Sequence, residues 1–391
     1  MRSSGNSIES RAMPNLFIPK ESSPGETRVA ATPETVKLFI KAGLVVSVEA
    51  GAGVKAFIAD DQFAAAGATM VSRSDGFASA DVVASVAPPL PSDVPSMRPG
   101  AILIAFLAPH RNLDLVRTFV ERRVTSFAME LIPRTTRAQV MDALSSQASI
   151  AGYKAALIAA TELPRYFPLL MTAAGTIKPA RVVVMGAGVA GLQALATAKR
   201  LGAVVEVSDI RPAVKEQVAS LGGRFIDLPM EESGEGTGGY AREVSADFLR
   251  RQREIVTRHI AAADVVITTA QVPGRKAPIL VTREMLDGMR PGSVVLDLAV
   301  EAGGNVEGSQ PDVEVNYKGV RILGYSNLAG TVPYDASVLY ARNVQSLSGE
   351  FVKKGGEIVL ELENEIIRDS LLTHSGMVFH QPTAELLKGG A

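Results

Sequence analysis

The sequence contains no cysteine among its 391 residues. Disulfide bonds, thiolate catalysis and metal sites built from cysteine are therefore excluded. The four histidines show no metal-ligand spacing, so we expect structural or surface roles for them and no metal site. The 40 lysines and arginines balance 41 aspartates and glutamates, giving a formal net charge of -1. No basic footprint therefore indicates a nucleic-acid partner.

Long apolar runs are also missing. The longest uncharged stretch, residues 182–198, is shorter than about 20 residues and is interrupted by glycines and Gln193, so it does not predict a membrane span. The first dozen residues are polar and have no apolar segment of the secretory type. We expect a cytoplasmic protein in which residues 1–13 form a disordered extension.

What is present is an ordinary apolar content, 47% hydrophobic residues, which is typical of a globular protein with a sizeable core. Strand-like and helix-like segments alternate along the chain. This alternation predicts an α/β fold class, with two doubly wound parallel-sheet (Rossmann-like) domains around a cleft. We expect residues 14–145, completed by 335–391, to form the first domain and residues 146–334 to form a dinucleotide-binding second domain.

The clearest motif is Gly-x-Gly-x-x-Gly at residues 186–191, which follows an apolar run and opens a helical pattern. Gly186 allows a tight turn off the strand, Gly188 lets a pyrophosphate approach the backbone, and Gly191 lets the helix pack close to the sheet. The amino end of the helix offers free N–H groups and a positive dipole end to phosphates. The motif therefore predicts dinucleotide binding.

An acidic residue stands at the expected distance beyond this motif. Asp209 ends a second apolar run, where a carboxylate accepts hydrogen bonds from the ribose hydroxyls. It would repel a 2′-phosphate, which favours NAD(H), whereas Arg211 could receive such a phosphate and leaves NADP(H) open. The neighbouring candidate contacts are Ala187, Val189 and Ile210.

Three long segments, residues 128–155, 171–227 and 296–305, closely resemble the NAD(H)-binding component of proton-translocating nicotinamide nucleotide transhydrogenases. The similarity extends over nearly the whole chain from about Phe17. Alanine dehydrogenases are close relatives of that family, and residues 18–36 are similar to both groups.

The resemblance implies a function and a set of partners. A component of this family binds NADH and passes hydride directly to NADP⁺ held by a separate NADP(H)-binding domain, while a membrane domain couples the transfer to proton movement. Those two domains would be on other chains. The resemblance also implies a homodimer, placed peripherally on the inner side of the cell membrane through its partner subunits.

The resemblance further implies site residues on a nicotinamide-side loop, namely Arg134, Gln139, Asp142 and Ser145. Arg134 and Gln139 can hold the nicotinamide amide and ribose or phosphate oxygens, and Asp142 can fix Arg134 or accept from the amide. The alternative interpretation of this loop is a helix start with solvated charges.

A second loop, residues 229–240, is too polar and glycine-rich to pack, and it is typical of a mobile surface loop. The resemblance implies that Tyr240 in this loop closes over the nucleotide. It adds Gly239 and Gln252 as nucleotide contacts, and Gln271 at a position where the residue type differs from that of the family.

Two other functions remain open: a divergent dehydrogenase and a non-catalytic NAD(H)-binding module. In alanine dehydrogenases a lysine, a histidine and an aspartate act on the substrate, and these positions fall on Ser85, near Ala108, and on Glu301 here. Arg28 matches the residue that holds the substrate carboxylate. Without the lysine and the histidine no base is apparent, whereas hydride exchange between two nicotinamides needs only close, dry apposition of the rings. The pattern therefore favours a transhydrogenase, although many of those also have a lysine at the position of Ser85.

Overall fold

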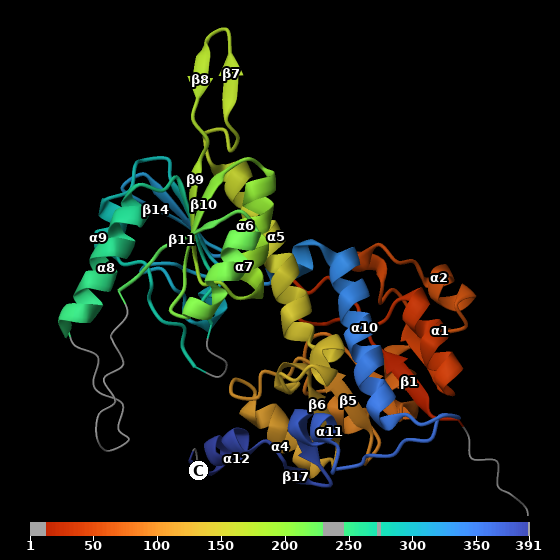
Figure 1. Ribbon diagram of the computed structural model, residues 1–391. Coiled ribbons are helices and arrows are strands. Elements are labelled where there is room, and N and C mark those ends of the chain that lie inside the picture. The colour runs from red at the N-terminus through yellow and green to blue at the C-terminus, as the bar shows by residue number, and fades with distance from the viewer. Residues whose placement is uncertain (1–12, 230–245, 272–274, 390–391) are drawn as a thin grey trace, which may run out of the picture. The chain divides into compact units, whose positions relative to one another are not determined.

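A computed structural model of the protein describes residues 13–229, 246–271 and 275–389 (Figure 1). The chain divides into two compact units, which we call unit 1 (Met1–Gln147 with Val332–Ala391) and unit 2 (Ala148–Thr331). Unit 1 therefore combines the beginning and the end of the chain, whereas unit 2 is one continuous segment. Most of the expected extension, residues 1–12, lies outside the described residues.

Unit 1 is built on a sheet with the strand order β17-β16-β6-β5-β4-β1-β2-β3. Strands β1 to β6 are parallel, and β16 and β17 are added to one edge in antiparallel pairing. The strands are β1 (Asn15–Ile18), β2 (Val45–Glu49), β3 (Thr69–Val71), β4 (Val82–Ala84), β5 (Ile102–Ala105), β6 (Thr125–Ala128), β16 (Leu371–His374) and β17 (Met377–Val378).

Both faces of this sheet are buried. Leu16 and Ile18 of β1 pack in one core with helices α1, α10 and α11, while Phe17 points to the other face and packs in a second core with α3 and α4. Burial on both faces explains why these strands are apolar at consecutive positions. The helices of unit 1 are α1 (Pro33–Ala42), α2 (Asp60–Ala65), α3 (Arg73–Ser79), α4 (Leu113–Glu121), α10 (Pro333–Phe351), α11 (Glu365–Ser370) and α12 (Gln381–Gly389).

Helix α1 connects the early part of unit 1 to the tail of the chain. Thr32 caps its amino end in a reciprocal pair with Thr35, and Gly43 ends it with φ of 100°. A Cβ atom at Gly43 would lie 2.4 Å from the backbone nitrogen of Gly356. The end of α1 thus contacts backbone that is more than 300 residues away in the sequence.

Unit 2 has a second sheet, with the strand order β11-β10-β9-β12-β13-β15-β14. Its strands are β9 (Arg181–Met185), β10 (Val204–Ser208), β11 (Arg224–Phe225), β12 (Val265–Thr268), β13 (Val294–Asp297), β14 (Glu314–Tyr317) and β15 (Val320–Leu323). In both units the parallel strands follow the order 3-2-1-4-5-6 of a doubly wound fold. The predicted fold class, parallel-strand α/β units of Rossmann type, is confirmed.

Helices cover both faces of this sheet as well. Helices α5 (Ala143–Glu162), α6 (Val189–Arg200) and α7 (Lys215–Ser220) contribute to the core on one face, and Figure 1 shows them on one side of β9 and β10. Helices α8 (Ala246–Ala261) and α9 (Arg283–Asp287) contribute to the core on the other face. The edge strand β14 is antiparallel to β15 and turns into it through Lys318 and Gly319, both at positive φ.

A two-stranded hairpin, β7 (Leu170–Thr172) and β8 (Gly175–Ile177), lies between α5 and β9 in the sequence. No pattern in the sequence predicted this hairpin. Residues 171–178 are all exposed, and Figure 1 shows the hairpin standing away from the rest of unit 2. Apolar side chains that would normally be buried, including Met171 and Ile177, are therefore exposed to solvent.

In the described part of the chain, no helix is long and apolar enough to cross a bilayer. The same residues contain no group of three or more histidines, cysteines or acids arranged to hold a metal ion.

A close backbone contact between α5 and α6 generates a prediction. A Cβ atom at Gly152 would lie 2.0 Å from the carbonyl oxygen of Ala190, in the first turn of α6. We expect Gly152→Ala to lower the free energy of unfolding by about 1–3 kcal/mol, because the helices must move apart. Gly349→Ala is the matched control, since this exposed glycine of α10 has no described atom within 4 Å of its Cβ position.

The control should be neutral or gain up to about 1 kcal/mol from the better helix former. Urea unfolding followed by circular dichroism measures both variants. Equal stability of the two variants would show that the α5–α6 contact does not depend on the missing side chain.

Candidate functional site

The glycine turn lies at the carboxyl end of β9, between that strand and α6. Gly186 has φ of 106°, a conformation that L side chains rarely adopt. A Cβ atom there would also lie 2.6 Å from Thr269 Oγ1. Both observations explain why this first position of the motif is glycine.

The other two motif glycines have different surroundings. A Cβ atom at Gly191 would lie 1.8 Å from the carbonyl oxygen of Gly186, so α6 packs against the turn itself as well as on the sheet. At Gly188 no described atom lies within 4 Å of the Cβ position. Gly188 is the amino cap of α6, so an approachable backbone and the first N–H groups of a helix occur together. This open space fits the diphosphate of a dinucleotide.

Asp209 fastens this turn to the end of β10. Its carboxylate accepts a hydrogen bond from the Ala187 backbone N–H at 2.7 Å. It also accepts from Arg211, from the backbone N–H at 2.8 Å and from Nε and Nη2 at 3.0 Å each. Burial alone would raise the pKa of Asp209, but the hydrogen bonds from Arg211 and Ala187 bring it below its ordinary value. The carboxylate is therefore ionised and oriented.

The same contacts bear on the role of Arg211. Its guanidinium pairs with Asp209 through two N–H groups, so it neutralises the carboxylate in this structure. The side chain of Asp209 is 7% exposed, while that of Arg211 is 57% exposed. Arg211 therefore covers the carboxylate from the solvent side. The adjacent Ile210 is 90% exposed, and Val189 at the start of α6 is 43% exposed.

A buried polar cluster shapes the loops at the carboxyl ends of β12 and β13. Asp297 accepts from the backbone N–H groups of Ala299, Asn305 and Val306 at 2.9–3.1 Å. The side chain of Asn305, which is fully buried, bonds both the N–H and the carbonyl of Ala270. Sequence reasoning did not assign this cluster. Its signal was the run Asp-Leu-Ala-Val-Glu-Ala-Gly-Gly-Asn directly after a buried strand.

The two predicted glutamine contacts lie on different elements of unit 2. Gln271 follows β12 and donates to the Leu298 carbonyl at 2.8 Å. Gln252 lies on α8 and donates to the Pro229 carbonyl at 3.1 Å. Gly239 and Tyr240, together with the loop assigned to residues 229–240 beyond Pro229, lie outside the described residues.

The predicted nicotinamide-side residues lie in unit 1, around a short helix η4 (Arg137–Met141). Asp142 precedes α5 and accepts from Ser145, from its backbone N–H at 2.9 Å and its hydroxyl at 2.6 Å. This is the geometry of a helix cap. Asp142 is therefore held by Ser145, and the expected option of an Asp142–Arg134 pair is not what the structure has.

Arg134 and Gln139 are exposed, and their side chains make no hydrogen bond or ion pair within the described part of the chain. The nearby Arg137 differs, because it pairs with Glu350 of α10. The two arginines of this loop thus have different surroundings: one pairs within the unit and the other offers all its donors to solvent.

In the segment between β1 and α1, Arg28 is buried and paired. Its Nε and Nη2 donate to Glu26 at 2.7 and 2.6 Å, and its Nη1 donates to Gln147 at 2.8 Å. Ser85, after β4, is 3% exposed, and its carbonyl accepts from the Tyr340 hydroxyl at 2.7 Å. The positions that the sequence resemblance assigns to the carboxylate-binding arginine and the lysine of alanine dehydrogenases are thus filled by a neutralised pair and a buried serine.

Two acids of unit 1, one buried and one half-buried, were not predicted from the sequence. Glu21 accepts from the backbone N–H groups of Val86 and Ala87 at 2.6 and 3.1 Å, and burial raises its pKa to about 7. Glu130 accepts from the N–H groups of Leu107 and Ala108, and burial also raises its pKa. Each acid binds the backbone that follows a neighbouring strand, so its oxygens already have donors. Their position gives them a role in holding the loops.

Comparisons with known proteins agree with this picture. The chain is 47% identical over 374 residues to an NAD(P) transhydrogenase subunit alpha protein of Rhodospirillum rubrum, covering 93% of this chain and 97% of that protein. It is 28% identical to an alanine dehydrogenase of Bacillus subtilis, covering 94% and 93%. A solved transhydrogenase structure from Sinorhizobium meliloti matches with a TM-score of 0.83 and 46% identity, covering 94% of this chain and 99% of that one.

Two family models also match, described as alanine dehydrogenase/PNT, N-terminal domain, over residues 17–151, and alanine dehydrogenase/PNT, C-terminal domain, over residues 155–381. These matches confirm the resemblance found in the sequence and NAD(H) as the cofactor it predicted. The chain belongs to the alanine dehydrogenase/PNT family.

Proposed function

We propose that this chain is the NAD(H)-binding component of a proton-translocating transhydrogenase, and that hydride passes directly from its NADH to NADP⁺ on a partner chain. The observation that carries the proposal is which side chains unit 1 has in the segments after β1, β4 and β5. Arg28 is neutralised by Glu26, and Ser85 and Ala108 stand where a dehydrogenase needs a lysine and a histidine. A direct exchange of hydride between nicotinamides requires no such groups, because no proton is removed from a substrate.

The residues have separate tasks in this proposal. The open backbone at Gly188 and the amino end of α6 hold the diphosphate. Asp209, ionised and fixed by Ala187, accepts from the ribose hydroxyls. Arg134 and Gln139, which have no partner among the described residues, donate to the nicotinamide end. When bound, NADH supplies the hydride.

The remaining family contacts belong to the same proposal. Asp142 and Ser145 hold the nicotinamide-side loop at the start of α5. The resemblance adds Tyr240, which would close over the nucleotide, and Gly239 as a nucleotide contact, both outside the described residues. The partners are an NADP(H)-binding domain and a membrane domain on other chains, which would bring this chain to the inner face of the membrane and couple the transfer to proton movement. The name of the Rhodospirillum rubrum relative describes it as a subunit, which supports the existence of such partner subunits.

The proposal includes a homodimer to which the β7–β8 hairpin contributes. A lone two-stranded hairpin is marginally stable in water. This one exposes the apolar side chains of Leu169, Met171 and Ile177 on or next to its two short strands. Contact with a second copy of the chain would bury them, in line with the assembly that the family resemblance implies.

The alternative is a divergent amino-acid dehydrogenase, and the observation in its favour is that Arg28 is retained. A dehydrogenase would reduce NAD⁺ with amino or hydroxy acids when the chain is alone. The proposed component would be inactive alone and active with its partner domain.

Changing Asp209 tests the cofactor site. Asp209→Asn keeps an acceptor for the Ala187 N–H but removes the charge. We expect NADH to bind about tenfold more weakly, because a charge-assisted hydrogen bond to the ribose hydroxyls is lost. We also expect the preference for NADH over NADPH to fall, because the repulsion of the 2′-phosphate is lost. Fluorescence titration measures both nucleotides. Asp227→Asn, which breaks the exposed pair with Lys215, is the control, and equal affinities of the two variants would place the ribose elsewhere.

Hydride transfer itself is tested by reconstitution. The purified chain is mixed with the NADP(H)-binding domain of a transhydrogenase, NADPH and an oxidised NAD analogue, and reduction of the analogue is followed. We expect fast transfer that requires both proteins, and a loss of at least about tenfold in Arg134→Ala through poorer positioning. Arg137→Ala is the control, because Arg137 pairs with Glu350. Absent transfer with NADH binding intact, or equal losses in both variants, would contradict the proposal.

The dimer is tested at the hairpin. Met171→Glu places a charge on a side chain that is 79% exposed in the chain alone. We expect sedimentation to show a shift from dimer to monomer, since a buried unpaired charge is costly at an interface. Met377→Glu, in the β16–β17 hairpin of unit 1, makes the same change at a position that is 59% exposed and should leave the dimer intact. A wild-type chain that sediments as a monomer would contradict the proposed homodimer.

A further inference from the structure

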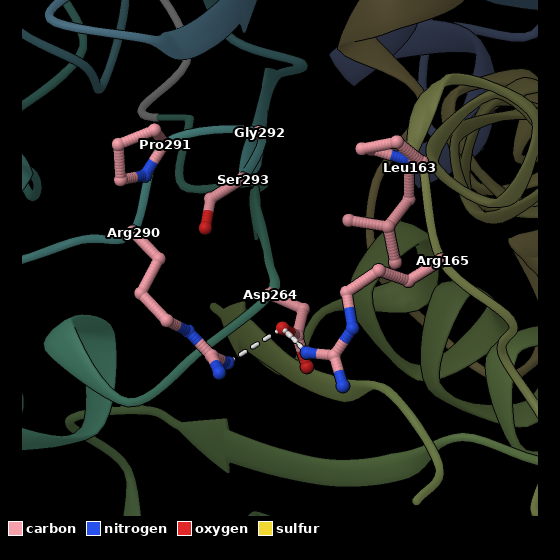
Figure 2. Close-up of a pocket in the computed structure, with 8 residues that line it drawn as sticks. Leu163, Arg165, Asp264, Arg290, Pro291, Gly292 and Ser293 are labelled. Carbon is pink, nitrogen blue, oxygen red and sulfur yellow. Dashed lines mark hydrogen bonds and ion pairs between the residues drawn. The ribbon is translucent and has the colours of Figure 1, made fainter. Parts of the chain in front are cut away.

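A pocket of about 230 Å³ lies at the amino ends of β12 and β13, formed by residues 163–165, Asp264 and residues 290–293 (Figure 2). The glycine turn follows the carboxyl end of β9, which is parallel to β12. The pocket therefore lies at the opposite ends of the strands, and the length of a four-residue strand, about 13 Å, separates it from the glycine turn. Neither the glycine motif nor Asp209 contributes to it.

One buried carboxylate holds two arginines at this pocket. Asp264 Oδ1 accepts from Arg290 Nη2 at 2.6 Å and from Arg165 Nη1, and its Oδ2 accepts from the Arg181 backbone N–H at 2.9 Å. The Asp264 side chain is only 5% exposed, and Figure 2 shows both guanidinium groups meeting at it. Two positive groups and one negative group leave a local charge of +1.

The arginines have donors to spare. Each guanidinium carries five N–H groups, and each is bonded only to Asp264 among the described residues. Their side chains are 40% and 57% exposed, so these unused N–H groups are accessible. The two like charges are held at one oxygen atom, and their mutual repulsion is only partly compensated by a single carboxylate. A second anion would relieve that repulsion.

The remaining lining suits a small, compact ligand. Gly292 has φ of 87° and places no side chain in the pocket. The Ser293 hydroxyl donates its one hydrogen in a long bond, 3.4 Å to the Ala263 carbonyl, and turning that hydrogen toward a ligand in the pocket would give up only this weak bond. Figure 2 shows this hydroxyl directed toward the space enclosed by the labelled side chains. Leu163 and Pro291 form apolar walls beside these polar groups.

We propose that this pocket binds the phosphate group of inorganic phosphate or of a phosphate ester, with Arg165 and Arg290 as its ligands. Two guanidinium groups that approach from different segments can each donate to a different pair of oxygens of a tetrahedral oxyanion. A carboxylate offers only two oxygens in one plane and can satisfy one such fork. Binding here is separate from the dinucleotide and does not depend on the proposed function.

The experiment is calorimetric titration of inorganic phosphate into the full chain saturated with NADH, in phosphate-free buffer, so that the glycine turn is already occupied. We expect one saturable site, and at least about tenfold weaker binding in Arg165→Gln and in Arg290→Gln, because each loses charge-assisted hydrogen bonds. Arg283→Gln, at an exposed arginine of unit 2 outside the pocket, is the control and should bind like the wild type. NADH affinity should be unchanged in all variants.

Arg290→Lys distinguishes a loss of phosphate binding from a loss of folding, because it keeps a cation for Asp264 but loses the planar fork of the guanidinium. It should retain the thermal stability of the wild type and still bind phosphate more weakly. Absence of saturable binding, phosphate binding that survives both glutamine substitutions, or acetate binding as tightly as phosphate would overturn the proposal.

A further arm identifies the source of the phosphate group. Vesicles that contain phosphatidic acid are compared with phosphatidylcholine vesicles, with and without methyl phosphate as a competitor. Retention on phosphatidic acid that is lost in Arg290→Gln supports the site with a lipid headgroup as its ligand. Binding of methyl phosphate without vesicle retention supports the site with a soluble phosphate ester.

Discussion

The start of α6 is held by backbone contacts so close that the glycines involved have no room for a side chain. Gly191 rests on the carbonyl of Gly186, and the carbonyl of Ala190 lies where a side chain on Gly152 would be. A third constraint is the hydrogen bond from the Ala187 N–H to Asp209, which joins the turn to the next strand. Together these contacts hold the amino end of α6 beside the end of β9. The open backbone at Gly188 is available to a ligand only because its neighbours are packed this closely.

The two units share a strand order but not a site, so topology alone does not assign their roles. In unit 2 the first strand is followed by a glycine turn with free space beside it. In unit 1 the first strand is followed by Glu21, Glu26 and Arg28, which are buried and bonded to one another or to nearby backbone. The carboxylates already accept from N–H groups and the arginine already pairs with a carboxylate. These side chains therefore have a structural role at this end of the sheet. We therefore assign the proposed chemistry to the second unit and to the exposed loop around Arg134.

Local patterns in the sequence were sufficient for the alternation of strands and helices and for the glycine turn. Strands β9, β12 and β13 are apolar at nearly every position because both sheet faces are covered, and the spacing of the motif glycines is set within six residues. The hairpin β7–β8 and the short strands β3, β11 and β14 were not predicted, since they are exposed or half-exposed and show no apolar run. The proposed ribose-side role of Asp209 follows from its place after a strand. Its bond to Ala187 spans 22 residues and depends on the folded sheet.

Other features of the site also depend on contacts in the folded structure, so the sequence alone did not predict them. The raised pKa of Glu21 comes from burial in the folded unit, where its carboxylate lies against the backbone of Val86 and Ala87, about 65 residues later in the sequence. Asp142 and Ser145 were chosen through a family resemblance, yet their observed bond is a local helix cap, a pattern that the sequence alone contained. The asymmetry between Arg134 and Arg137 arises from Glu350, more than 200 residues later. Contacts of that range belong to the tertiary structure.

The split composition of unit 1 has a consequence for the order of events on the ribosome. Unit 2 is complete once Thr331 has been added, whereas unit 1 still lacks α10, β16 and the Gly356 contact with Gly43. At about 5–20 residues per second, the last 60 or so residues take roughly 3–12 s to synthesise. During that interval the apolar face of β1 and β5 that α10 later covers stays open. Unit 2 is thus the first to be complete, and during this interval the half-built sheet of unit 1 is exposed to aggregation and to chaperones.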